Sequence, residues 1–157
     1  MKKIIFTFLI IVVISTSVNA QEELTWHTDM NKAFELATKE NKTLMLFFTG
    51  SDWCGWCIRL QNEVLKTSDF LQWAKDKLVL VELDFPRRTP LEEKTKIQNY
   101  QMQKMFKVSG YPTVYFAKPE KTLEGKKNLN TLGSTGYVRG GAEKWLEVAN
   151  NIIQANP

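Results

Sequence analysis

Residues 43–57 decide the fold, and they read Thr-Leu-Met-Leu-Phe-Phe-Thr-Gly-Ser-Asp-Trp-Cys-Gly-Trp-Cys. Thr43 to Phe48 form a continuous apolar run of strand length, which favours a central strand that is buried on both faces. Thr49 to Asp52 then turn the chain. The following segment, which begins with Trp53-Cys54-Gly55-Trp56-Cys57, is a predicted helix with two cysteines at its start.

The spacing of the two cysteines indicates redox chemistry. If Cys54 lies in the first turn of a helix, Cys57 lies one turn later on the same face, so the two sulfurs can form a disulfide or remain a dithiol. Exchange requires a thiolate, and the free N–H groups and dipole of a helix N-terminus favour this charged form. We therefore predict that Cys54 is the exposed nucleophile with a lowered pKa, and that Cys57 is the buried resolving cysteine.

Three other uses of the cysteines were considered. A zinc site takes four ligands as a rule, and only Cys54, Cys57 and the lone His27 have zinc-preferring side chains. A haem attachment site needs histidine after the second cysteine, where this chain has Ile58. A purely structural disulfide that closes so short a loop removes little entropy from the unfolded chain. We thus expect no metal and no cofactor beyond the two thiols, with a structural disulfide or a metal site as the weaker alternatives.

The rest of the chain alternates between strand and helix patterns, which predicts the α/β class and a single domain. The 157 residues, of which 43% are hydrophobic and 24% charged, suit one globular domain. Asp69 is expected to cap a short helix, and the polar residues 118–136 are expected to be a long hairpin connection. The other expected elements are strands at 24–27, 78–85 and 114–117 and helices at 29–40, 92–106 and 142–153.

The N-terminus has the layout of a secretory signal peptide. Met1-Lys2-Lys3 is basic, Ile4 to Ile14 is apolar apart from one threonine, and Val18-Asn19-Ala20 supplies small residues before a cleavage site. The apolar run is shorter than the about 20 residues that cross a bilayer. We predict a signal peptide at residues 1–20, a domain at residues 21–157, and no membrane span after cleavage.

Export and charge limit the partners. Export places the protein in the periplasm or outside the cell, where disulfides persist. The formal net charge of +4 includes Lys2 and Lys3 of the signal peptide, so the domain itself carries too small an excess for a nucleic-acid surface.

Two motifs give the chain a specific resemblance. Phe47-Phe48 followed by Trp53-Cys54-Gly55-Trp56-Cys57 resembles the strand, tryptophan and active-site helix of the thioredoxin superfamily. Residues 108–114, Val-Ser-Gly-Tyr-Pro-Thr-Val, resemble the second signature of that family. The resemblance extends over residues 24–153, with an insertion at residues 86–96. It implies a thioredoxin-like fold, in which helices flank a central mixed β-sheet.

The resemblance also assigns site residues. It implies a cis bond between Tyr111 and Pro112, packed against the sulfurs. The aromatic rim, which we define as Trp53, Trp56 and Tyr111 together with the intervening Gly55, would suit the docking of an extended polypeptide.

One feature departs from the family. Many thioredoxins bury an aspartate in the strand before the cysteine motif, where this chain has Phe47 and Phe48. Glu82 on the next strand is a candidate for the missing acid that assists Cys57. A strand-edge glutamate that faces water is an equal alternative for Glu82.

These observations lead to a hypothesis of function. We expect a thiol-disulfide oxidoreductase that exchanges disulfides with exported proteins through Cys54 and Cys57. Reduction is favoured over oxidation because the overall pattern resembles the reducing thioredoxins, and a membrane electron donor is a further expected partner. The alternative is a non-catalytic peptide-binding or protein-binding module of the same fold with a permanent disulfide.

Overall fold

The structure is a computed structural model that describes residues 24–122 and 124–155, so the predicted signal peptide at residues 1–20 lies outside it. Its centre is a mixed sheet in the strand order β1-β3-β2-β4-β5. The first three strands of that order are parallel, whereas β4 is antiparallel to both β2 and β5. The strands are β1 (Trp26–His27), β2 (Thr43–Thr49), β3 (Leu78–Asp84), β4 (Thr113–Lys121) and β5 (Lys127–Thr135).

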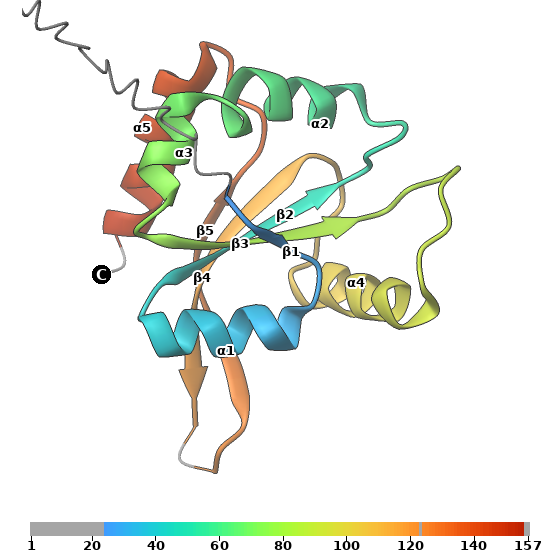
Figure 1. Cartoon of the computed structure of the whole chain (residues 1–157), viewed down its shortest axis with the longest axis vertical. Helices are drawn as coiled ribbons and strands as arrows, with labels where there is room; N and C mark the ends of the chain where they lie inside the picture. The colour runs from blue at the N-terminus through green and yellow to red at the C-terminus, as the bar shows by residue number, and fades with distance from the viewer. Residues whose placement is uncertain (1–23, 123, 156–157) are drawn as a thin grey trace, which may run out of the picture.

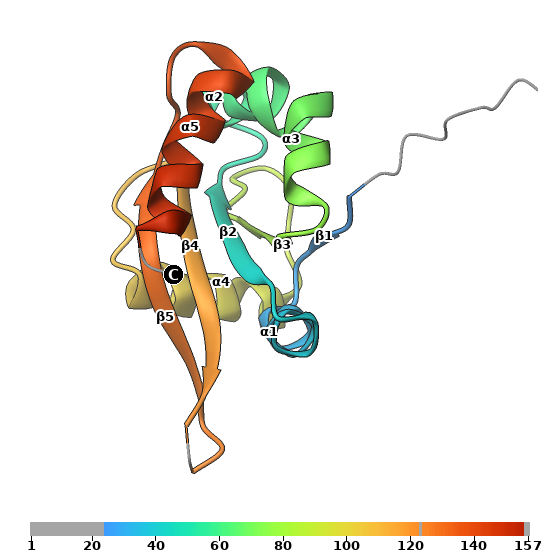
Figure 2. The same ribbon diagram turned by 90° about the vertical axis from the view of Figure 1, so that its left-hand side faces the viewer.

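Helices cover both faces of the sheet, which confirms the α/β class. In Figures 1 and 2, α2, α3 and α5 lie on one face, while α1 and α4 lie on the other. Within the described residues, no helix has the length and apolar character needed to span a membrane. The helices are α1 (Met30–Glu40), α2 (Gly55–Leu60), the π-helix η1 (Gln61–Leu65), α3 (Ser68–Ala74), α4 (Glu93–Met105) and α5 (Gly141–Gln154).

Strand β2 is buried along its whole length, as its apolar sequence predicts. Because successive side chains of a strand point to opposite faces, the strand supplies two cores. Met45 and Phe47 join the cluster under α2, η1, α3 and α5. Leu44, Leu46 and Phe48 join the cluster under α1 and α4. The strand therefore fixes both helical layers, and its C-terminal end delivers the chain to the cysteines.

The helix caps show where local sequence signals were sufficient to predict a helix start and where they were not. Asp29 caps α1, and its Oδ1 accepts the N–H groups of Asn31 at 2.9 Å and Lys32 at 3.2 Å. The predicted cap of α3 at Asp69 was wrong. Thr67 caps that helix through its Oγ1, which accepts the N–H of Phe70 at 3.3 Å, and Asp69 lies in the first turn. A threonine and an aspartate two residues apart are both good caps, so the sequence alone did not choose between them.

Residues 118–136 form a hairpin, as predicted, but most of them lie in paired strands rather than in a connection. Strand β4 continues to Lys121, and residues 127–135 return as β5, so that the two form the hairpin that projects from the sheet in Figure 2. Because β5 is an edge strand with mostly exposed side chains, it lacks the apolar alternation by which strands are recognised. Gly133, at φ 153°, lies beside the register shift, where a Cβ atom would overlap Ile152 of α5.

Candidate active site

The two cysteines form a disulfide at the start of α2. Cys54 is the N-cap residue of the helix, Cys57 lies in its first turn, and their Cα atoms are 5.2 Å apart. The Cys54 Sγ accepts the backbone N–H of Cys57 at 3.2 Å. A sulfur at an N-cap faces the unpaired N–H groups and the positive end of the helix dipole, which favour a thiolate there.

The two sulfurs differ in access. Cys54 retains 5% of its accessible surface, whereas Cys57 retains none. The expectation that Cys54 is exposed was therefore wrong for the disulfide form, because the disulfide packs both residues into the core cluster that Trp53 and Tyr111 also contact. The asymmetry has the expected direction, since only Cys54 offers any surface to a partner.

Aromatic side chains surround the disulfide. Trp53 contacts Tyr111 edge to face, with ring centroids 5.7 Å apart. Trp56 is 53% exposed, and its ring lies 5.2 Å from that of Tyr137 and 5.4 Å from the guanidinium carbon of Arg59. The residues predicted for the aromatic rim thus belong to two groups of packed rings, Trp53 with Tyr111 and Trp56 with Tyr137.

Tyr111 is fixed by contacts on several sides. The Tyr111–Pro112 peptide bond is cis, the geometry that the resemblance implies. The Tyr111 hydroxyl accepts a hydrogen bond from Gln103 Nε2 at 2.6 Å, and burial raises the pKa of this hydroxyl to about 12. Tyr111 therefore stays neutral at all physiological pH values and acts as a rigid apolar wall.

Glu82 is neither fully buried nor fully exposed to water, the two alternatives that the sequence left open. The side chain is half-buried on β3 opposite Phe47, and it lines a cavity of about 170 Å³ together with Gln61 and Lys66. Gln61 lies one turn after Cys57, and its backbone N–H donates to the Cys57 carbonyl. Burial, and to a smaller extent the charge of Asp84, raise the pKa of Glu82. The carboxyl group is therefore partly shielded from bulk water, on the side of the sheet that carries the cysteine helix.

Asp52, which no sequence motif singles out, ties the cysteine motif to the loop at residues 85–91. Its Oδ1 accepts the N–H of Arg87 at 3.0 Å, and its Oδ2 accepts those of Arg88 and Thr89 at 2.7 and 3.0 Å. The Arg88 guanidinium also donates to the Asp52 carbonyl. These hydrogen bonds, with that of Arg87 first, lower the pKa of Asp52. The only sequence signal was an aspartate directly before the motif, and nothing in it indicates partners 35 residues away.

The same loop holds Trp53. The indole Nε1 donates to the Phe85 carbonyl at 2.8 Å, and the Arg87 guanidinium carbon lies 3.8 Å from the centroid of the indole ring. A Cβ atom at Gly50 would overlap this indole. Arg87 and Arg88 are therefore part of the scaffold of the site.

Metal-ligating side chains are scattered in the part of the chain that the structure describes. Residues 24–122 and 124–155 contain no group of three or more His, Cys, Asp or Glu side chains that could hold a metal ion. His27 lies in β1, and its strand pairs with β3 rather than with the cysteine helix.

Comparison with known proteins identifies the family to which the chain belongs. The family model described as Thioredoxin-like matches residues 25–119. The disulfide bond reductase DsbH of Chlamydia pneumoniae is 34% identical over 119 residues, which are 76% of this chain and 71% of DsbH. This chain belongs to the thioredoxin-like family. The thioredoxin-like match includes both the cysteine motif and the Tyr111–Pro112 segment.

Other thioredoxin-like proteins agree. The thioredoxin-related protein DsbJ of the same organism is 27% identical over 119 residues, which are 76% of this chain but 33% of DsbJ. A solved DsbH oxidoreductase structure superimposes with a TM-score of 0.72 at 32% identity, and the match covers 83% of this chain and 85% of that one. A thioredoxin from Thermus thermophilus has the same fold, with a TM-score of 0.60 at 17% identity and coverage of 83% and 87%. The chain is a thiol-disulfide oxidoreductase with a thioredoxin-like fold.

Proposed function

We propose that this protein is a reductase that transfers two electrons from the Cys54–Cys57 dithiol to disulfides of exported proteins. The observation that carries the proposal is the cysteine pair at the start of α2, with Cys54 as the N-cap and Cys57 fully buried. The name of the relative that is 34% identical, a disulfide bond reductase, supports the reducing direction. The aromatic rim supports a polypeptide as the substrate, because aromatic side chains bind apolar segments at low entropic cost.

The proposed reaction has two exchange steps. The Cys54 thiolate attacks one sulfur of the partner disulfide, forms a mixed disulfide with it and releases the other sulfur as a thiolate. The Cys57 sulfur, after losing its proton, then attacks Cys54 Sγ and displaces the remaining partner sulfur. The protein ends with the Cys54–Cys57 disulfide, and the partner gains two electrons and two protons. A further turnover requires a dithiol donor, which we propose to be a membrane protein.

Export is part of the proposal. The basic, apolar and small-residue layout of residues 1–20 supports cleavage after Ala20 and a location in the periplasm or outside the cell. N-terminal sequencing of the exported protein should therefore begin at Gln21, and retention of residues 1–20 would contradict the proposal.

Insulin reduction tests the function directly. The mature protein, with dithiothreitol as the electron source, should accelerate the precipitation of insulin chains over dithiothreitol alone. The reduction potential of the Cys54–Cys57 couple should lie near that of thioredoxin, about −270 mV, rather than near the about −120 mV of a strong oxidant. Peptide binding without turnover would favour the alternative of a non-catalytic binding module, and a potential near −120 mV would reverse the direction.

We also propose that Glu82 accepts the proton of Cys57 in the second step. The cavity that Glu82 shares with Gln61 is large enough for water, and it connects the carboxyl group with the helix turn after Cys57. Glu82→Gln should slow resolution of the mixed disulfide by tenfold to a hundredfold, the lower range of general-base effects, and leave the first attack unchanged. Acid-quenched single-turnover reactions analysed by mass spectrometry separate the two steps.

The same substitution has a useful property for this test. Burial raises the pKa of Glu82, so the ionised carboxylate is disfavoured in the folded state. The free energy of unfolding therefore falls as the pH rises from the unfolded-state pKa of Glu82 through its folded-state pKa. The neutral glutamine should therefore not destabilise the protein at pH 7. Glu124→Gln, an exposed acid in the turn of the projecting hairpin, is the matched control. Equal rates of both steps in Glu82→Gln and wild type would remove Glu82 from the mechanism.

A further inference from the structure

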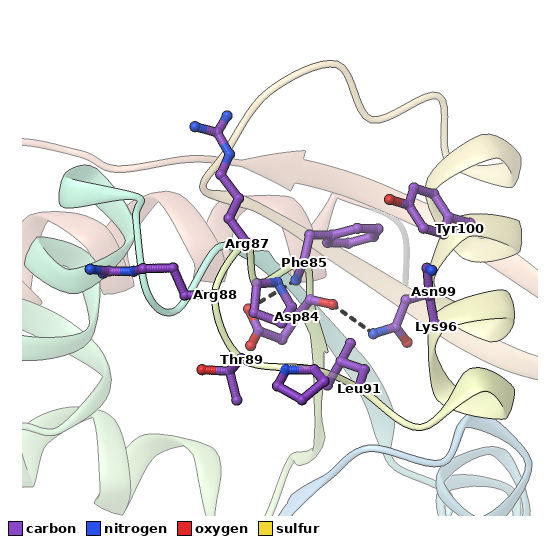
Figure 3. A pocket seen from close by; sticks show the side chains of 11 residues that line it. Asp84, Phe85, Arg87, Arg88, Thr89, Leu91, Lys96, Asn99 and Tyr100 are labelled. Carbon is purple, nitrogen blue, oxygen red and sulfur yellow. Dashed lines mark hydrogen bonds between the residues drawn. The ribbon is translucent and has the colours of Figure 1, made fainter.

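A second, larger cavity lies between the loop at residues 85–91 and helix α4. Its volume is about 480 Å³, within the range of sites that take small ligands or large side chains. Figure 3 shows Phe85 and Leu91 on the loop side and Asn99 and Tyr100 on the helix side. The reaction proposed above does not use this cavity.

Hydrogen bonds within the protein hold the walls of the cavity in place without a ligand. The loop is held by the three backbone N–H groups that donate to Asp52. At the base of the cavity, Asn99 Nδ2 donates to the Asp84 carbonyl at 2.9 Å, a contact drawn in Figure 3. The N–H of Phe85 donates to the Thr49 carbonyl at 2.9 Å. A site whose walls are already ordered loses little entropy on binding.

A row of aromatic rings connects the cavity with the cysteine motif. Trp53 contacts Tyr111, Tyr111 contacts Phe85 at 5.2 Å between centroids, and Phe85 contacts Tyr100 at 5.5 Å. Each step of 5–6 Å is slightly less than the length of two residues of an extended chain, about 6.5 Å. A polypeptide that is bonded to Cys54 and follows this row would reach the cavity a few residues from its cysteine.

The charges around the cavity select against basic segments. Arg87, Arg88 and Lys96 contribute to its lining. The one carboxylate in the lining, that of Asp84, accepts the N–H and hydroxyl of Ser51 and the N–H of Phe85, so its oxygens already have hydrogen-bond partners. Phe85, Leu91, Tyr100 and two prolines supply the apolar part of the lining, beside the polar side chains of Thr89 and Asn99.

We propose that this cavity is a specificity subsite, which binds one large apolar side chain of the polypeptide segment that flanks the reactive cysteine of a partner. The inference rests on the proposed function, because it assumes that the partner is a polypeptide with a disulfide. The loop at residues 85–91 forms one wall of the subsite, and Asp52, which holds that loop, lies two residues before Cys54.

Designed peptides test the subsite. Symmetric disulfide dimers of a Gly/Ser peptide with one cysteine carry a single leucine at two to six residues on either side of the cysteine. We expect leucine at one of these spacings to raise the second-order rate of reduction by the prereduced protein about tenfold over serine, and lysine at that spacing not to raise it. Tyr100→Ala should remove most of this preference. Ile97→Ala, which shortens an exposed side chain of α4 outside the cavity, should retain it.

A binding measurement separates the subsite from the reaction. The best peptide with serine in place of cysteine should shift the amide resonances of Phe85, Leu91 and Tyr100 in the disulfide form of the protein. Such shifts without reduction of any peptide would leave the subsite standing and contradict the proposed function. Reduction at equal rates for all spacings, or an unchanged preference in Tyr100→Ala, would overturn the subsite. Equal affinity for N-acetyl-leucine amide would show a small-molecule pocket instead.

Discussion

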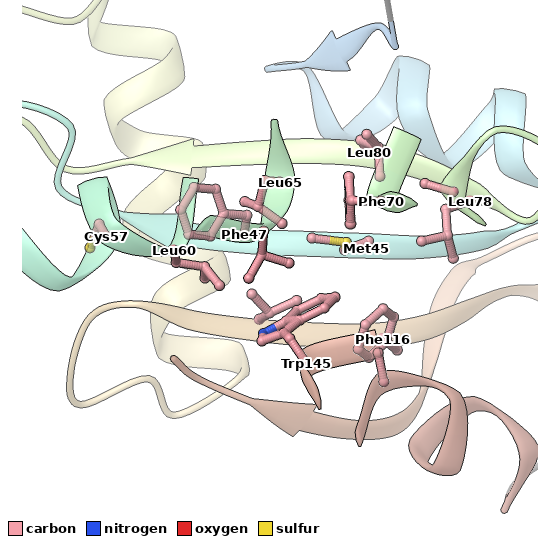
Figure 4. Close-up of a cluster of buried hydrophobic side chains, with 14 of the residues drawn as sticks. Met45, Phe47, Cys57, Leu60, Leu65, Phe70, Leu78, Leu80, Phe116 and Trp145 are labelled. Carbon is pink, nitrogen blue, oxygen red and sulfur yellow. The ribbon is translucent and has the colours of Figure 1, made fainter. Parts of the chain in front are cut away.

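Replacing Trp145 by alanine should lower the free energy of unfolding by about 3–5 kcal/mol. Trp145 of α5 has no accessible surface, and its ring lies 6.0 Å from that of Phe70, 6.2 Å from that of Phe116 and 6.3 Å from that of Trp73. Figure 4 shows it in the cluster that runs from Cys57 and Leu60 to Phe116 and Leu78. Alanine would leave a cavity that this close-packed cluster cannot fill by relaxation.

Urea unfolding of the mature protein measures the effect. The midpoint should fall while the m-value stays constant, because the change affects stability rather than the surface exposed on unfolding. Trp56→Ala is the matched control, since Trp56 is 53% exposed and its removal should change the stability by less than about 1 kcal/mol. Similar losses for both tryptophans would mean that α5 does not anchor this layer.

Trp145→Phe separates packing from hydrogen bonding. The indole Nε1 donates to the Gly136 carbonyl at 3.0 Å, and phenylalanine keeps most of the ring but loses this donor. We expect an intermediate loss, of about 1–3 kcal/mol, from the unsatisfied carbonyl and the smaller ring. Because α5 packs on the same cluster as Cys57, a loss of this packing also loosens the support of the cysteine helix.

The parts of the fold that the sequence predicts are those with strong local signals. The apolar run of β2 is long enough to be buried on both faces, and Asp29 is followed by a helix whose apolar residues, Ala33 and Ala37, share one face. Strand β5 has no such signal, because its backbone pairs with β4 while most of its side chains face solvent. The π-helix η1 also escapes prediction, since α2 continues into it without a break in the sequence pattern.

The site divides in the same way. Cys54 and Cys57 lie in one short motif and Pro112 in another, and each motif can be recognised from neighbouring residues alone. The structure brings the two segments to one end of the sheet, where Phe48 of β2 pairs with Thr113 of β4. The partners of Asp52 lie 35 to 37 residues further along the chain, so only the folded backbone shows that this carboxylate supports the site. The burial of Glu82 depends on residues from β1, β2 and η1 that the strand pattern does not identify.

The roles of the two cysteines have the largest expected effect on activity. Cys54→Ser should lower insulin turnover by more than about a hundredfold, because it removes the nucleophile of the covalent route. Cys57→Ser should also stop turnover, but after the first exchange, so that covalent complexes with disulfide-bearing partners accumulate. Non-reducing electrophoresis of each variant, expressed in the exporting organism, distinguishes the two blocks. Complexes that disappear on reduction are expected with Cys57→Ser and not with Cys54→Ser.

Alkylation of the reduced wild-type protein tests the same order without a substitution. The Cys54 sulfur stands at the N-cap of α2, where backbone N–H groups stabilise a thiolate, whereas Cys57 has no accessible surface. At pH 6, an ordinary thiol with a pKa of about 8.5 is less than about 1% ionised. Iodoacetamide should therefore modify Cys54 at least about tenfold faster than Cys57, as peptide mapping can measure. Faster modification of Cys57, or trapped complexes with Cys54→Ser, would reverse the roles, because the sulfur that attacks a partner must be both ionised and accessible.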